Sequence, residues 1–141
     1  MSNKLSSNSL INMFQITTID IDEKGVSVFG ETIHELDDRN GMFLSGPINA
    51  LNFRLRKSHE SYEADWHVAG DPTLLLIMAG TVRISLRNGD YRDFSVGDLF
   101  IAKDKLLAGG EFDCTRHGHR AEVIGGAPLS VVHIKLAKLD D

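Results

Sequence analysis

Two histidines, His67 and His119, are the residues of this chain best suited to chemistry in a pocket. His67 lies in the run Asp65-Trp66-His67, and His119 follows Gly118. An imidazole titrates near neutral pH, so two of them in a mostly apolar pocket could act as general acid and general base. We therefore predict His67 and His119 as the catalytic residues.

The same two histidines could instead bind a divalent metal, for which the sequence gives weak support. A catalytic metal usually has three protein ligands and an open position, and oxygen-activating metals commonly use two histidines and a carboxylate. Asp65 shares strand parity with His67 and could supply that carboxylate in an altered geometry. The alternative, which we favour, is that Asp65 caps a turn or pairs with an arginine. The cofactor is therefore left open.

A second cluster contains Cys114, His117 and His119 within six residues. Thiolate and imidazole ligands would favour zinc, but a structural zinc site generally needs four ligands. His59 would have to come from a distant loop, and a free cysteine is more often a small buried hydrophobe. We do not predict zinc here. The remaining histidines are expected at surface or structural positions: His34, His59 and His133.

Composition excludes several classes of partner. The chain has 141 residues and a net charge of −5 without an evident basic face, which argues against a nucleic-acid partner. Its longest apolar run is too short to span a bilayer, and its first residues do not resemble a signal peptide. No Ser-His-Asp pattern, phosphate-binding glycine loop or nucleophilic cysteine signature is present. We expect a cytoplasmic protein that binds a small molecule and neither nucleic acid nor membrane.

The elements that would position the histidines are short β-strands. Residues 81–86 alternate between apolar and polar side chains, as a half-buried strand does. Asn88-Gly89 follows and predicts a two-residue type I′ turn into a returning strand. The unbroken apolar runs 74–78 and 99–102 indicate strands that are covered on both sides. This pattern predicts antiparallel β structure.

The rest of the chain adds strands and almost no helical periodicity. Residues 1–10 are expected to be a disordered N-terminus, and residues 11–141 one β-barrel domain. Residues 37–41 are predicted as a charged turn and residues 103–116 as a loop. Val132, Ile134 and Leu136 are expected to face the core. Many short, closely spaced strands predict an all-β sandwich or barrel of the jelly-roll kind. The further strands are expected at residues 14–21, 26–29, 33–36, 50–57, 119–124 and 129–136.

The order of these motifs resembles the cupins, and more narrowly a group of small single-domain bacterial cupins. The resemblance extends from about Phe29 to Leu136. It is carried by Asp65-Trp66-His67, by the glycine that closes the apolar strand, by the turn before the next strand and by a final Gly-His pair. The glycine is Gly80, the turn is Gly97-Asp98 and the final pair is Gly118-His119. The resemblance implies a double-stranded β-helix and a homodimer, in which the exposed N-terminal strands are a pairing edge.

The chain departs from the ligand pattern of metal-binding cupins. The resemblance places His67 on the first histidine of the first motif, Ala69 on the second and Thr73 on the glutamate. Two of three first-motif ligands are therefore absent. His119 is the best candidate for the histidine of the second motif, after an insertion at residues 106–116. Lys103 and Val123 stand in place of its usual proline and asparagine.

A pocket follows from this resemblance, with its mouth formed by loops near 58–62 and 103–117. Beside His67 and His119, its predicted residues are Phe53, Asp65, Thr73, Leu75 and Ile77. The predicted function is small-molecule binding with an undetermined reaction. One alternative is a non-catalytic binding or sensing module, which the missing glutamate favours. Another is a metal-dependent oxygenase, isomerase or lyase. Whether the protein is an enzyme is left open.

Overall fold

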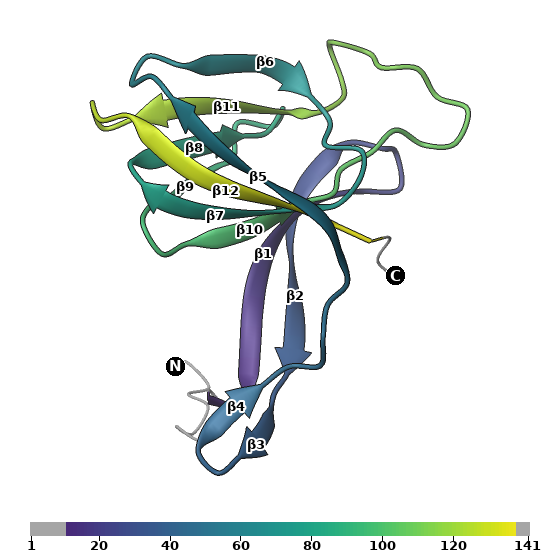
Figure 1. The fold of residues 1–141 in the computed structure, drawn as a ribbon. Coiled ribbons are helices and arrows are strands. Elements are labelled where there is room, and N and C mark those ends of the chain that lie inside the picture. Colours follow the sequence, from purple (N-terminus) through teal and green to yellow (C-terminus); the bar gives the residue numbers. More distant parts are fainter. Residues whose placement is uncertain (1–10, 138–141) are drawn as a thin grey trace, which may run out of the picture.

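The computed structural model describes residues 11–137, which form β-strands joined by turns and loops (Figure 1). The expected disordered segment 1–10 lies outside the described residues. The strands are β1 (Met13–Ile21), β2 (Ser27–Glu35), β3 (Asp37–Arg39), β4 (Met42–Leu44), β5 (Ala50–Ser58), β6 (Glu63–His67), β7 (Thr73–Ala79), β8 (Thr81–Ser85), β9 (Tyr91–Phe94), β10 (Leu99–Ala102), β11 (His119–Ile124) and β12 (Leu129–Leu136).

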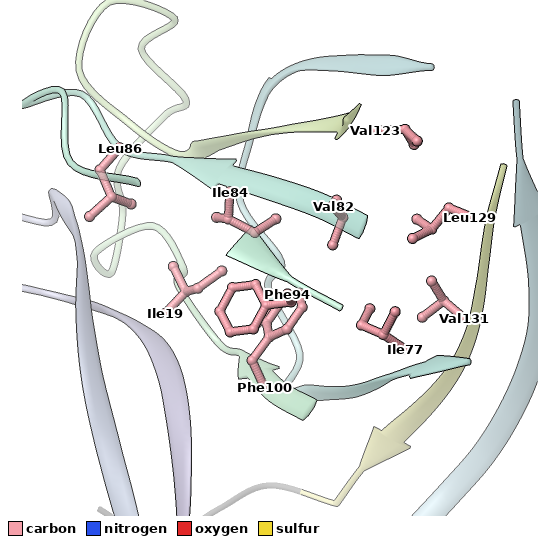
Figure 2. Close-up of a cluster of buried hydrophobic side chains, with 11 residues drawn as sticks. Ile19, Ile77, Val82, Ile84, Leu86, Phe94, Phe100, Val123, Leu129 and Val131 are labelled. Carbon is pink, nitrogen blue, oxygen red and sulfur yellow. The ribbon is translucent and has the colours of Figure 1, made fainter. Parts of the chain in front are cut away.

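Two sheets enclose the core. One has the order β2-β1-β10-β7-β12-β5, and the other has the order β6-β11-β8-β9. Neighbouring strands are antiparallel except β1 and β10, which pair in parallel. Figure 2 shows Ile19, Ile84, Phe94, Phe100 and Ile77 gathered between the sheets. The predicted all-β architecture, a double-stranded β-helix of two facing sheets, is confirmed.

The continuous apolar runs place apolar side chains on both faces of the larger sheet, although Met78 of the first run is 54% exposed. In β10, Phe100 and Ala102 pack into the core between the sheets, whereas Ile101 packs with Ile16 and Leu136 on the outer face of the larger sheet. β7 lies between β10 and β12, away from the sheet edges. A strand in such a place needs apolar residues at successive positions, which explains the loss of alternation.

The faces of β5 and β12 that point to the cavity were predicted wrongly, although Leu136 is buried as expected. Val131 and His133 face the cavity between the sheets, whereas Ile134 lies on the outer face of the larger sheet. Phe53 pairs with Ile134 and is 68% exposed, and Arg56 pairs with Val131 and faces inward. Alternation separates the two faces of a strand without saying which one points inward. In β5 the apolar Leu51, Phe53 and Leu55 are exposed on the outer face and Arg56 faces the cavity, so hydrophobicity indicated the wrong face.

Two turns also differ from expectation. The predicted charged turn 37–41 consists of strand β3 and the turn of the β3–β4 hairpin, which Asn40 and Gly41 form with φ of 57° and 94°. At Asn88-Gly89, by contrast, only the glycine has positive φ, so this is not the predicted type I′ turn. The loop there is longer than two residues: the Leu86 amide donates a hydrogen bond to the Asp90 carbonyl, so residues 87–89 lie in the loop. Both turns still join antiparallel strands.

β1 and β2 form an arm that leaves the barrel. The two strands pair over nine residues each, and in Figure 1 they run together away from the two sheets to the β3–β4 hairpin. The first half of β1 is largely exposed, whereas Thr18 and Ile19 are fully buried where the strand joins the barrel. The arm therefore carries apolar side chains beyond the reach of the core.

Candidate functional site

A cavity of about 250 Å³ lies between the two sheets. The predicted residues His67, His119, Thr73, Leu75 and Ile77 all line it. The smaller sheet contributes the histidines, and β7 contributes the other three as alternate residues of one strand. The structure therefore brings together most of the predicted pocket, at a size near the lower end of ligand sites, roughly 300 Å³.

His119 is held by a buried carboxylate that the sequence analysis did not single out. Asp104, in the loop after β10, is 0% exposed, and its Oδ2 lies 2.8 Å from Nδ1 of His119. The same carboxylate accepts hydrogen bonds from Oγ of Ser27 at 2.7 Å and from the backbone amide of Ala69 at 3.0 Å. An ionised carboxylate is an acceptor at both oxygens. This set of donors therefore identifies Nδ1 of His119 as the donor to Asp104.

His67 lies next to His119 at the mouth of the cavity. The two ring centroids are 4.5 Å apart, with the rings inclined at 56°. Nδ1 of His67 lies 2.7 Å from the carbonyl oxygen of Asp65, which can only accept, so Nδ1 must donate. With both Nδ1 atoms donating, the neutral form of each ring has an acceptor at Nε2. His119 is buried and His67 is exposed, so the pair extends from the interior to the surface.

Gly118 allows this close approach. Its φ is +88°, and a Cβ atom there would lie 2.6 Å from the carbonyl oxygen of His67. His119 is the register partner of His67, and the pairing of β11 with β6 shifts immediately afterwards. A side chain at position 118 would therefore push the loop away from β6, and with it the start of β11. The Gly-His pair seen in the sequence has a structural reason.

Two predicted pocket residues lie elsewhere. Phe53 points to the outer face of the larger sheet, so its assignment to the pocket was wrong. Asp65 is exposed and is not part of the cavity wall. Its backbone carbonyl oxygen accepts a hydrogen bond from His67 instead. β6 is an edge strand that pairs only with β11, so carbonyl groups on its other side are free to accept side-chain hydrogen bonds. Alternation along the strand predicted that Asp65 and His67 point to the same side, but it could not show that only His67 reaches the cavity.

The donor atoms do not fit a metal centre of the kind that cupin resemblance implies. Within residues 11–137 there is no group of three or more His, Cys, Asp or Glu side chains able to hold a metal. His67 and His119 supply two nitrogens, and Thr73 directs its hydroxyl to the carbonyl of Asp71. The Asp104 carboxylate contacts the far side of the His119 ring.

The Cys114 cluster forms no zinc site in the described part of the chain. Cys114 is exposed and free. Nδ1 of His117 accepts a hydrogen bond from the backbone amide of Asp113, 2.9 Å away. Thr115 donates to the Asp113 carboxylate from its hydroxyl and its amide, and these bonds lower the pKa of that carboxyl. These contacts order the loop rather than prepare a metal site.

Arg56 and His133 line the cavity from the larger sheet, and the sequence analysis missed both as site residues. Nη1 of Arg56 lies 3.4 Å from Nε2 of His133. Partial burial and the positive charges of Arg56 and Arg54 lower the pKa of His133. The only available signal was alternation with the apolar residues of β5 and β12, and that signal was assigned to the wrong face.

Comparisons with known proteins agree with the fold. No family model and no curated protein matches the chain. Among solved structures, it is similar to a cupin-2 domain protein from Shewanella frigidimarina, with 17% identity over 60% of this chain and 69% of that one and a TM-score of 0.43. A cupin 2 conserved barrel domain protein from Rhodopseudomonas palustris has 13% identity over 92% and 74%, with a TM-score of 0.47.

A third similar structure is protein NMB1881 from Neisseria meningitidis, with 18% identity over 74% of this chain and 82% of that one and a TM-score of 0.44. Two of these three neighbours are described as cupins. The likenesses concern the fold and carry no reaction with them. Separately, no helix within residues 11–137 is long and apolar enough to cross a membrane.

Proposed function

We propose that this domain binds a small molecule in the cavity between its sheets and moves protons to and from it with His119 and His67. The observation that carries the proposal is the hydrogen bond between the buried Asp104 carboxylate and Nδ1 of His119. That bond fixes one tautomer and leaves Nε2 on the opposite side of a ring that lines the cavity.

The surroundings of the two rings suggest different roles. When Nε2 of His119 accepts a proton, the adjacent Asp104 carboxylate stabilises the imidazolium that forms. His119 is therefore the general base. Nδ1 of His67 meets only a neutral carbonyl, and the ring reaches solvent. His67 is the general acid: water protonates its Nε2, the imidazolium gives that proton to the ligand, and water then restores it.

Hydrogen exchange on small carbonyl compounds tests this role. The protein would be incubated in deuterium oxide with a panel of charged and neutral 2-oxo, 2-hydroxy and β-dicarbonyl compounds, followed by ¹H NMR. We expect exchange at a C–H bond next to a carbonyl in at least one compound. General acid–base groups typically contribute on the order of 10²–10⁴ in rate, so His119→Gln should slow the exchange at least ~100-fold.

Two further variants make the result interpretable. Asp104→Asn keeps the shape of the side chain and removes the charge, so it should slow exchange while His119 remains in place. His34→Gln changes a histidine on the arm and should exchange at the wild-type rate. Full activity in His119→Gln, or no exchange on any compound, would contradict acid–base chemistry at this site.

A non-catalytic binding or sensing module is the second candidate. It is favoured by Thr73, which stands where the resemblance expects a glutamate and offers no charge to the cavity. This alternative predicts saturable binding of a ligand that is recovered unchanged, with His119 acting as a hydrogen-bonding partner. Detection of any product would exclude it.

A further inference from the structure

We infer that the cavity takes a small carboxylic acid, whose carboxylate binds Arg56 with His133 beside it. This inference rests on the proposed function, since it names the class of molecule on which the two histidines would act. It concerns the opposite wall of the cavity, which β5 and β12 form.

Arg56 is a half-buried cation without a counter-ion in the described part of the chain. Its Nε donates to Oγ of Ser58 at 3.0 Å, and its Nη1 donates to Nε2 of His133. The Tyr62 ring lies 5.0 Å from the guanidinium carbon. None of these partners is negatively charged, and a buried charge is costly unless it is paired. The remaining N–H groups are thus available to an anion in the cavity.

His133 adds a second donor next to this cation. Because its Nε2 accepts from Arg56, the proton of the neutral ring is on Nδ1. Nearby Arg54 and Arg56 oppose a second proton on the ring. The neighbouring residue of β7 in the register is Leu75, which brings no charge. Among the residues that line the cavity, the subsite therefore offers one fixed positive charge, on Arg56, and one neutral N–H donor, on His133, while Arg54 lies opposite His133 on β5 and outside the cavity lining.

One positive charge beside a neutral donor matches a carboxylate better than a phosphate. A guanidinium presents parallel N–H groups that fit the two oxygens of a carboxylate. A phosphate dianion would keep one charge uncompensated in a cavity whose other walls include Leu75, Ile77 and Val82. The volume of about 250 Å³ also limits the ligand to a small molecule.

The cavity then has two polar regions with different roles, one that binds the carboxylate and one that transfers protons. Arg56 and His133 come from the larger sheet, whereas His67 and His119 come from the smaller sheet. A ligand bound through its carboxylate at the first pair would present its carbon skeleton to the second. Such fixed orientation is what proton transfer at a defined carbon requires. The inferred ligand is a short acid with a reactive carbon near its carboxylate.

Matched pairs of ligands test the subsite directly. Binding of short 2-oxo and 2-hydroxy acids, of their uncharged amides and of inorganic phosphate would be measured by isothermal titration calorimetry. We expect saturable binding of at least one acid and at least tenfold weaker binding of its amide. Loss of a hydrogen bond to a charged group costs about 1.5–3 kcal/mol, so Arg56→Gln should weaken acid binding by about tenfold or more.

The controls separate this inference from the proposed function. Arg39→Gln removes an exposed arginine of β3 that does not line the cavity and should change affinity less than about threefold, as expected for a distant surface charge. His119→Gln should retain acid binding. If acids bind but no compound exchanges hydrogen, the subsite stands and the proposed chemistry fails. Equal binding of acid and amide, unchanged affinity in Arg56→Gln, or stronger binding of phosphate would overturn the carboxylate subsite even if exchange occurs.

Discussion

At the scale of single residues, Asp104 influences the cavity without lining it. Its carboxylate joins the start of β2, the loop after β6 and the start of β11 through Ser27, Ala69 and His119. All buried polar side-chain atoms in the described residues have a partner, so the group is fully hydrogen-bonded. A buried charge with a complete set of partners fixes both a tautomer and the arrangement of three segments.

His133 gives a residue-scale prediction about pH. Partial burial, and then Arg56 and Arg54, lower its pKa in the folded protein relative to the unfolded chain. In the window just below the unfolded value of about 6.5, the unfolded chain binds more protons, so stability rises with pH there. We expect His133→Gln to remove part of the stability loss seen when the pH falls from about 7 to 5.5.

Urea denaturation of both proteins across this pH range measures the difference. His59→Gln alters a histidine in an exposed turn and serves as the matched control, expected to keep the wild-type pH dependence. Identical slopes in wild type and His133→Gln would show that this ring carries no proton linkage.

The site residues differed in how far sequence could reveal them. His67 and His119 could be found because each lies in a short motif, Asp65-Trp66-His67 or Gly118-His119, that resembles a motif of the cupins. Asp104 could not be found in this way, because an acidic residue in a loop is usually solvated and nothing local indicates its burial. Arg56 and His133 depended on which face of β5 and β12 points inward.

At the scale of elements, Gly118 determines how β11 meets β6. A Gly118→Ala substitution combines a φ of +88° with a Cβ atom 2.6 Å from the His67 carbonyl oxygen. Gly89→Ala is the matched control, because φ is +93° there and nothing lies within 4 Å. A non-glycine residue in the left-handed region costs roughly 1–2 kcal/mol. We expect Gly118→Ala to lose clearly more stability than Gly89→Ala.

Urea denaturation measures the two losses, and ¹H–¹⁵N NMR of the imidazoles reports the site. Gly118→Ala should shift the resonances of both His67 and His119, whereas Gly89→Ala should leave them in place. Equal losses in the two variants would mean that the approach of residue 118 to His67 is not tight.

Strand positions were largely predictable, and strand orientation was less so. The bounds expected for β10, β11 and β12 agree with the structure because apolar runs end at glycine, proline or charge. The continuous β2 was divided into two expected strands, since Gly30 and Glu31 interrupt its pattern. The β3–β4 hairpin was missed because its charged residues resemble a turn. Local patterns mark elements, whereas their faces are set by packing partners far along the chain.

At the scale of the whole molecule, the outer face of the larger sheet and the arm leave apolar side chains uncovered. We propose that a second copy of the chain covers them, which is the homodimer expected from the sequence. On this face Leu55 is 76% and Phe53 68% exposed, on the edge strand β5. Further large exposed apolar residues on the arm and beside it are Phe14, Ile33, Met42, Leu44 and Ile48.

The geometry favours a second copy over an unrelated partner. β2 and β5 are the two edge strands of the same sheet. If one of these edges pairs with the same edge of a second copy, the interface is isologous and the unpaired backbone groups of both copies gain partners. The arm extends past the barrel of its own chain, so its apolar side chains can reach a neighbouring barrel (Figure 1). A twofold dimer would bury the arm and the sheet face together.

Sedimentation equilibrium of the wild type and two charge variants tests the dimer. Phe53→Asp puts a carboxylate in the proposed interface, where its desolvation should weaken association at least ~100-fold. Val96→Asp introduces the same charge at a 67% exposed position in the turn after β9, in the other sheet, and should leave the dimer intact. A wild-type protein that stays monomeric up to ~100 µM would rule out a stable dimer, since standard interfaces reach micromolar affinity or better. Dissociation by both variants alike would place the interface elsewhere.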